Sequence, residues 1–165
     1  MRRSTWANVF LLLPASLAGQ NPASTYPQIH GAALQPAASP PAVKSIAAGY
    51  SYSLAVTSDG SVWEWGGSAG RSSMPVRVSG LTGVIAAARG DEHTLALRDD
   101  GTVWAWGSNS SGELGDGTTT SRSVPVQVGG LTDVAAVAAG SGYSLALKRD
   151  GTVWSWGWTN GPMYA

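Results

Sequence analysis

His93 is the residue best suited to chemistry, because it directly follows two carboxylates, Asp91 and Glu92. A hydrolase triad needs a histidine close to a carboxylate and to a nucleophile, and this segment supplies two of those three groups. His93 also takes the place that Tyr52 and Tyr143 take in two related segments of the chain. A position filled by either residue type favours a ring with a polar tip that packs and hydrogen-bonds. We therefore expect no catalytic residue and no enzyme activity.

A second pair of carboxylates, Glu113 and Asp116, lies in a glycine-rich stretch where a calcium ion could be imagined. Hard cations need several oxygen ligands, and the alternating carboxylates of a calcium loop are missing. A phosphate loop is not predicted either, because no Lys-Ser/Thr pair follows Gly117. The chain has no cysteine, which excludes disulfides and thiolate metal sites. We interpret the stretch as a structural turn and expect neither a metal nor another cofactor.

The composition favours strands and turns over helices. The chain has 165 residues with 22 Gly and 8 Trp, and only 12% of its residues are charged. Its formal net charge is zero, so no long-range field attracts nucleic acid or an acidic membrane. The sequence therefore predicts an all-β protein that binds no nucleic acid.

An internal repeat determines how these strands are organised. Three segments align without gaps, and 11 of their 24 positions are identical in all three, far more than chance gives. Successive copies begin 41 and then 50 residues apart. The repeat cores are residues 43–66, 84–107 and 134–157.

Each core predicts three antiparallel strands, and in the first two copies the segment after the core predicts a fourth. An Asp-Gly pair predicts a hairpin turn in every copy, since both residue types tolerate the positive φ of tight hairpins. One strand is expected on each side of this turn, and an earlier strand of small residues leads into an invariant glycine. A fourth strand is expected at 75–78 and 125–128. Four strands in 40–50 residues correspond to one blade of a β-propeller.

The strand after the turn carries two tryptophans in every copy, Trp63 and Trp65 in the first. Because side chains alternate along a strand, they share one face, while Val62 and Glu64 share a second face that we expect to be only partly buried. Exposed tryptophans could stack sugars or bases. Their recurrence in a fixed Val-Trp-x-Trp-Gly frame instead predicts a role in the core.

The repeat pattern G-x-x-[HY]-[ST]-L-A-[LV]-x-x-D-G-x-V-W-x-W-G resembles that of the regulator of chromosome condensation family. The second copy continues at residues 106–117 as W-G-S-N-S-S-G-E-L-G-D-G, very close to the family's motif, whereas the first copy lacks this insertion. The resemblance covers about 123 of the 165 residues. It implies a seven-bladed β-propeller that works mostly by protein–protein contact.

The array of repeats is too short for seven blades. It supplies about two to three four-stranded blades, and residues 43–165 stop before the fourth strand of the last copy. An open array leaves blade faces uncovered. We therefore expect either a fragment of a longer repeat protein, truncated at its C-terminus, or a chain that completes a ring by self-association.

The loops that follow the invariant glycines are the expected partner-binding residues, because they differ between copies on a constant frame. A solvated turn without a partner is the alternative interpretation. The predicted residues are Tyr50, Ser51, Asp91, Glu92, Ser141 and Gly142.

Residues 1–18 have the pattern of a signal peptide: a basic start, an apolar run at 6–13, Pro14, and small residues before the predicted cleavage after Ala18. A helix that spans a membrane needs about 20 apolar residues, and this run is shorter, so no membrane span is expected. Residues 19–42 are predicted to be a Pro/Ala-rich linker. The chain is thus expected to be secreted, periplasmic or on the cell surface. If the segment is only an apolar tail, the location is cytoplasmic.

These observations favour a non-enzymatic, exported module that binds or scaffolds an unidentified protein partner. The family resemblance implies two alternatives. One is a guanine-nucleotide exchange factor for a small GTPase, the activity of the family's founding member. The other is a secreted enzyme inhibitor of the β-lactamase-inhibitory type.

Overall fold

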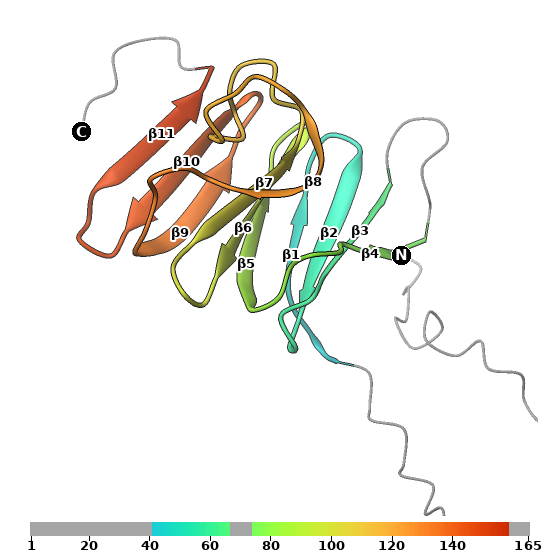
Figure 1. The fold of residues 1–165 in the computed structure, drawn as a ribbon. Coiled ribbons are helices and arrows are strands. Elements are labelled where there is room, and N and C mark those ends of the chain that lie inside the picture. The colour runs from blue at the N-terminus through green and yellow to red at the C-terminus, as the bar shows by residue number, and fades with distance from the viewer. Residues whose placement is uncertain (1–40, 67–73, 159–165) are drawn as a thin grey trace, which may run out of the picture. The chain divides into compact units, whose positions relative to one another are not determined.

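All regular elements in the described part of the chain are strands (Figure 1). The computed structural model describes residues 41–66 and 74–158. The predicted signal peptide and the linker up to residue 40 lie outside the described residues. No helix in the described ranges is long and apolar enough to cross a membrane. The prediction of an all-β chain is confirmed.

The strands form three antiparallel sheets, one for each repeat core, which we call blades 1, 2 and 3. Blade 1 has the order β1 (Val43–Ala48), β2 (Tyr52–Thr57), β3 (Val62–Gly66) and β4 (Val76–Arg77). Blade 2 has the order β5 (Val84–Arg89), β6 (His93–Arg98), β7 (Val103–Gly107) and β8 (Arg122–Gln127). Blade 3 contains β9 (Val134–Ala139), β10 (Tyr143–Lys148) and β11 (Val153–Gly157). This arrangement is the predicted set of two to three propeller blades.

The Asp-Gly turns have a different geometry from the one predicted. In blade 2 the Gly101 N–H donates to the carbonyl of Arg98 (3.0 Å), and Gly101 has a φ of 77°. Asp100 does not share the positive φ. Its carboxylate instead accepts hydrogen bonds from the Thr102 N–H (3.0 Å) and hydroxyl (2.6 Å), which lower the Asp100 pKa. The aspartate therefore stabilises the turn by accepting these hydrogen bonds with its side chain, as in other Asx turns.

In blades 1 and 2 the face carrying the valine after the turn is more deeply buried than predicted. Val62 and Val103 are fully buried, and so is Ala105, the counterpart of Glu64. This face of blade 1 packs on blade 2, whose Trp106 is 4% exposed in the same cluster. Trp154 of blade 3, by contrast, is 49% exposed, so the predicted tryptophan core is wrong at that position. Trp63 and Trp104 each pair with a residue of a fourth strand, whereas the described residues of blade 3 include only three strands, so Trp154 lies on an open edge.

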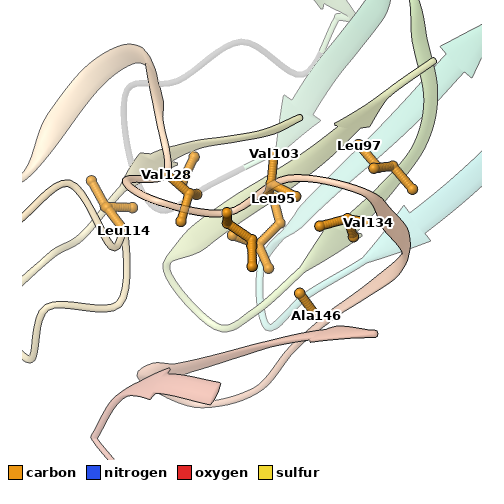
Figure 2. Close-up of a cluster of buried hydrophobic side chains, with 9 residues drawn as sticks. Leu95, Leu97, Val103, Leu114, Val128, Val134 and Ala146 are labelled. Atoms are coloured by element: carbon orange, nitrogen blue, oxygen red, sulfur yellow. The ribbon is translucent and has the colours of Figure 1, made fainter. Parts of the chain in front are cut away.

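Blades 2 and 3 are joined by a second aliphatic cluster (Figure 2). Leu95 and Val103 of blade 2 lie in one cluster with two buried residues of blade 3, Val134 in β9 and Ala146 in β10. Leu114, from the loop between β7 and β8, completes the cluster and is fully buried. Burying aliphatic side chains of this size removes apolar surface from water, which stabilises the contact between blades.

Backbone hydrogen bonds also join successive blades at the Asp-Gly turns. The Val84 N–H, at the start of blade 2, donates to the carbonyl of Gly60 in the turn of blade 1 (3.2 Å). The Val134 N–H repeats this contact with the carbonyl of Gly101 (3.1 Å). Each blade therefore begins on the turn of the blade before it.

Candidate functional site

The loops between the first two strands of each blade lie at the edge of the array opposite the Asp-Gly turns. We call this edge, formed by residues 49–51, 90–92 and 140–142, the loop end. The same hydrogen bond closes each loop, from the glycine N–H to the carbonyl three residues later, at 2.9 Å in all three copies. The backbone of the predicted binding loops is therefore fixed in the same way in each blade.

Two of the invariant glycines that begin these loops, Gly49 and Gly90, are required by close contact between blades. A Cβ at Gly49 would overlap the carbonyl oxygen of Gly90, and a Cβ at Gly90 would overlap the carbonyl oxygen of Gly140. Small residues therefore allow the blades to pack closely at this point. The contact sets the distance between adjacent loops.

Blades 1 and 2 form a first hollow of about 540 Å³ at the loop end. Four of the predicted residues, Tyr50, Ser51, Asp91 and Glu92, line it. Arg89 lines it as well, on a side chain that is only 5% exposed. The hollow thus combines exposed loop residues with a buried cation.

The buried cation belongs to a polar network across the two blades. Glu64 Oε1 lies 3.2 Å from Arg89 Nη1 and accepts hydrogen bonds from the Thr94 hydroxyl and the Trp106 indole N–H, both at 3.1 Å. Arg89 also donates to the Thr94 hydroxyl, and its guanidinium lies 4.4 Å from the centroid of the Tyr52 ring. The positive charge of Arg89 is therefore neutralised and fixed within the array.

The loops of all three blades line a second hollow of about 370 Å³ beside the first. Tyr50 and Trp158 line it and are 89% and 60% exposed. Asp91 and Glu92 line it too, and none of the described residues around it is Lys or Arg. The backbone N–H of Trp158 donates to the carbonyl of Gly142 (2.8 Å), which fixes the backbone of Trp158 beside this loop. The second hollow offers aromatic surface and carboxylates with no cation of its own.

His93 points into the interface between blades 2 and 3 and is 1% exposed. Its Nε2 lies 2.9 Å from the hydroxyl of Ser144, which itself donates to the carbonyl of Glu113 (2.8 Å). The serine proton is thus engaged, so the imidazole donates to the hydroxyl, and burial lowers the His93 pKa. Within the described residues no hydrogen bond joins His93 to Asp91 or Glu92, which are exposed. The prediction of a packed, hydrogen-bonded ring is confirmed.

The glycine-rich stretch forms a loop around Asn109, which is fully buried. The Asn109 side-chain amide donates to the carbonyls of Thr118 (3.0 Å) and Thr120 (3.1 Å). Its oxygen accepts a hydrogen bond from the Leu114 N–H (2.9 Å). One side chain therefore holds both halves of the loop and places Leu114 in the core.

The carboxylates of this loop are engaged by the protein. Asp116 accepts hydrogen bonds from the hydroxyl and N–H of Thr118 and pairs with Arg122 (2.8 Å). These contacts, led by the hydroxyl, lower the Asp116 pKa to about 2. Glu113 accepts a hydrogen bond from the Ser111 N–H (2.7 Å). The described residues contain no group of three side chains placed to hold a metal ion.

All the predicted partner-binding residues lie at the loop end, and the two hollows bring them together. Glu64, Arg89 and Trp158 also line the hollows but were not predicted from the sequence. Glu64 and Arg89 break the repeat pattern, where the other copies have small residues, and that departure was a usable signal. The arrangement offers fixed backbone, aromatic rings and carboxylates, which suit recognition of another molecule.

Comparison with known protein families gives two matches. A model described as the regulator of chromosome condensation (RCC1) repeat matches residues 43–69, 84–113 and 134–161. A second model of the same description matches residues 100–147. Each of the three matched segments begins where a repeat core begins. No curated protein matches the chain.

Several solved structures have a similar fold. Human WBSCR16 is 26% identical with a TM-score of 0.63, and the match covers 70% of this chain and 33% of that one. Yeast RCC1 (Prp20), solved bound to Kap60, is 26% identical with a TM-score of 0.60, over 70% of this chain and 32% of that one. Prp20p from Saccharomyces cerevisiae, described with its binding properties to Gsp1p and histones, has the same identity and TM-score, over 70% and 33%. The chain spans about a third of the length of these structures.

Proposed function

The chain belongs to the regulator of chromosome condensation (RCC1) repeat family, and we propose that it is a non-enzymatic module that binds a protein partner through the loop end. Frameworks of this kind carry function on loops that a rigid scaffold positions. The loops at 49–51, 90–92 and 140–142 meet that description, since glycine contacts and backbone hydrogen bonds fix them while their side chains differ.

The second hollow is the observation that carries this proposal. Tyr50 and Trp158 are large aromatic side chains that stay exposed, and tyrosine and tryptophan are enriched at binding interfaces. Asp91 and Glu92 add negative charge beside these rings. A Lys or Arg side chain would satisfy both features, through ion pairs with the carboxylates and cation–π contact with the rings. The proposed partner therefore presents a basic side chain to the loop end.

A peptide-display library panned against the full chain tests the proposal. The selected peptides should be enriched in Lys and Arg. Tyr50→Ala and the double variant Asp91→Asn/Glu92→Gln should each weaken a selected peptide by about tenfold or more, as expected when an interface anchor is removed. Affinity is measured by fluorescence anisotropy with a labelled peptide.

Asp99→Asn is the matched control, because Asp99 is an exposed carboxylate at the opposite, turn end of blade 2. It should leave the affinity unchanged. Enrichment of acidic peptides, or binding that is indifferent to the loop-end substitutions, would overturn the proposed site.

A second candidate function rests on the similarity to Prp20p, which is described with its binding to Gsp1p. This function is guanine-nucleotide exchange on a small GTPase. The test measures release of a fluorescent guanine nucleotide from Gsp1p with substoichiometric chain. Accelerated release supports exchange activity. Unchanged release with excess chain rejects it and leaves the loop-end proposal standing, since peptide binding is measured separately.

We further propose that the chain acts outside the cytoplasm, on the basis of the signal-like pattern in residues 1–18. Expression in a bacterial host followed by fractionation tests this. The exported product should begin at Gly19 by N-terminal sequencing. An intact N-terminus in the cytoplasmic fraction would contradict export.

A further inference from the structure

Blade 3 presents a face whose counterparts in the other two blades are buried. Three aliphatic positions recur on this face of every blade. In blades 1 and 2 all of them are exposed by 1% or less, and the next blade packs against them. In blade 3, Leu147 is 41% and Val153 is 54% exposed. The three sets are Leu54, Val56 and Val62; Leu95, Leu97 and Val103; and Leu145, Leu147 and Val153.

Blade 1 presents the complementary face at the other end of the array. The first strands of blades 2 and 3 pack against the preceding blade through Ala87 and Val137, which are partly buried there. The residue at the same register in blade 1 is Ile46, since Ile46 pairs with Ala55 as Ala87 pairs with Ala96. Ile46 is 73% exposed.

The backbone gives an independent indication of the same contact. The N–H groups that begin blades 2 and 3 donate to the carbonyl of the preceding Asp-Gly turn. The equivalent donor at the start of the array is the Val43 N–H, and the equivalent acceptor at its end is the Gly151 carbonyl. Within the described residues neither group takes part in such a contact between blades.

We propose that the blade 1 face of one chain, centred on Ile46, packs on the blade 3 face of a second copy, centred on Leu147. The two faces have the same chemistry as the interfaces that already join blades 1, 2 and 3. In this contact the Val43 N–H of one copy donates to the Gly151 carbonyl of the other. The chain has zero formal net charge, so no long-range repulsion opposes the approach of two copies.

The number of blades indicates how many copies associate. A contact between two different faces is heterologous, and it closes only if the rotation per copy completes a ring. Known propellers have about 4–8 blades. Two copies of this three-bladed array fall within that range and three copies exceed it. The expected species is therefore a closed dimer with two identical contacts.

Sedimentation velocity of the full chain over a range of concentrations tests the proposal. The wild-type chain should form a dimer, and Ile46→Glu and Leu147→Lys should each raise the dimer dissociation constant by about tenfold or more, because each buries an unpaired charge. Ile85→Lys is the control. Ile85 is 50% exposed at a β-bulge in blade 2, away from both end faces, and its substitution should leave dimerisation unchanged.

Mixing the two variants separates this contact from other dimers. Each variant alone should dimerise more weakly than the wild-type chain, whereas a mixture of the two should dimerise more tightly than either alone, because it pairs an intact blade 1 face with an intact blade 3 face. Val153→Lys replaces Leu147→Lys if tryptophan fluorescence shows that the latter is unfolded. A wild-type chain that stays monomeric at all concentrations overturns the proposal, as does a dimer that only one of the two variants disrupts.

Discussion

The ion pair between Glu64 and Arg89 should contribute measurably to the stability of the array. The Arg89 side chain is 5% exposed and that of Glu64 is 24% exposed. Removing one partner of a buried pair costs about 3–5 kcal/mol, because the other charge is left buried. Glu64 retains some solvent, and Arg89 keeps its contacts with Thr94 and Tyr52. We therefore expect Glu64→Ala to lower the free energy of unfolding by about 2 kcal/mol.

The assay is urea unfolding of the full chain followed by tryptophan fluorescence. A loss of this size corresponds to a shift of about 1 M in the urea midpoint for a domain of this length. Arg89→Met keeps the aliphatic stem and removes the charge. The double variant should cost little more than Glu64→Ala alone, giving a coupling energy of about 1 kcal/mol or more in the double-mutant cycle.

The surface pair between Arg98 and Asp100 is the matched control. Its atoms lie 3.0 Å apart, closer than those of the Glu64–Arg89 pair, but both side chains are solvated. The same cycle on this pair should give no measurable coupling, since water screens exposed charges. Equal coupling energies for the two pairs would refute the reasoning, because burial would then not determine the strength of the interaction.

Four further predictions concern stability. Asn109→Ala should lower the free energy of unfolding by about 3 kcal/mol in urea, because buried backbone groups lose their partners. The His93 pKa is lower in the folded state, so the unfolded state binds more protons. The free energy of unfolding should therefore decrease as the pH drops below about 6.5, and this decrease should be smaller in His93→Gln. Asp116 has a pKa of about 2 in the folded state, so its contribution to the free energy of unfolding should be lost only between about pH 4 and 2. Gly90→Ala should lower the melting temperature strongly because its Cβ overlaps blade 3, whereas Gly129→Ala, with its nearest neighbour at 3.5 Å, should not.

The repeat made the fold predictable, whereas contacts between blades were predictable only in part. The alignment located the hairpins and the six loop-end residues because each depends on local pattern. It did not predict the pairing of Glu64 with Arg89, since these residues lie on different blades and break the repeat. Period-two alternation also showed which side chains share a face. It could not show that Val62 and Ala105 are fully buried, because that depends on the next blade.

Blade 2 covers the aliphatic face of blade 1, and this order of packing affects the nascent chain on the ribosome. Blade 1 cannot bury its aliphatic face until the next repeat, which begins 41 residues later, has been synthesised. At about 5–20 residues per second this delay is about 2–8 seconds. During that time Leu54, Val56 and Val62 are available to a chaperone. Each added blade protects the one before it and exposes its own face in turn.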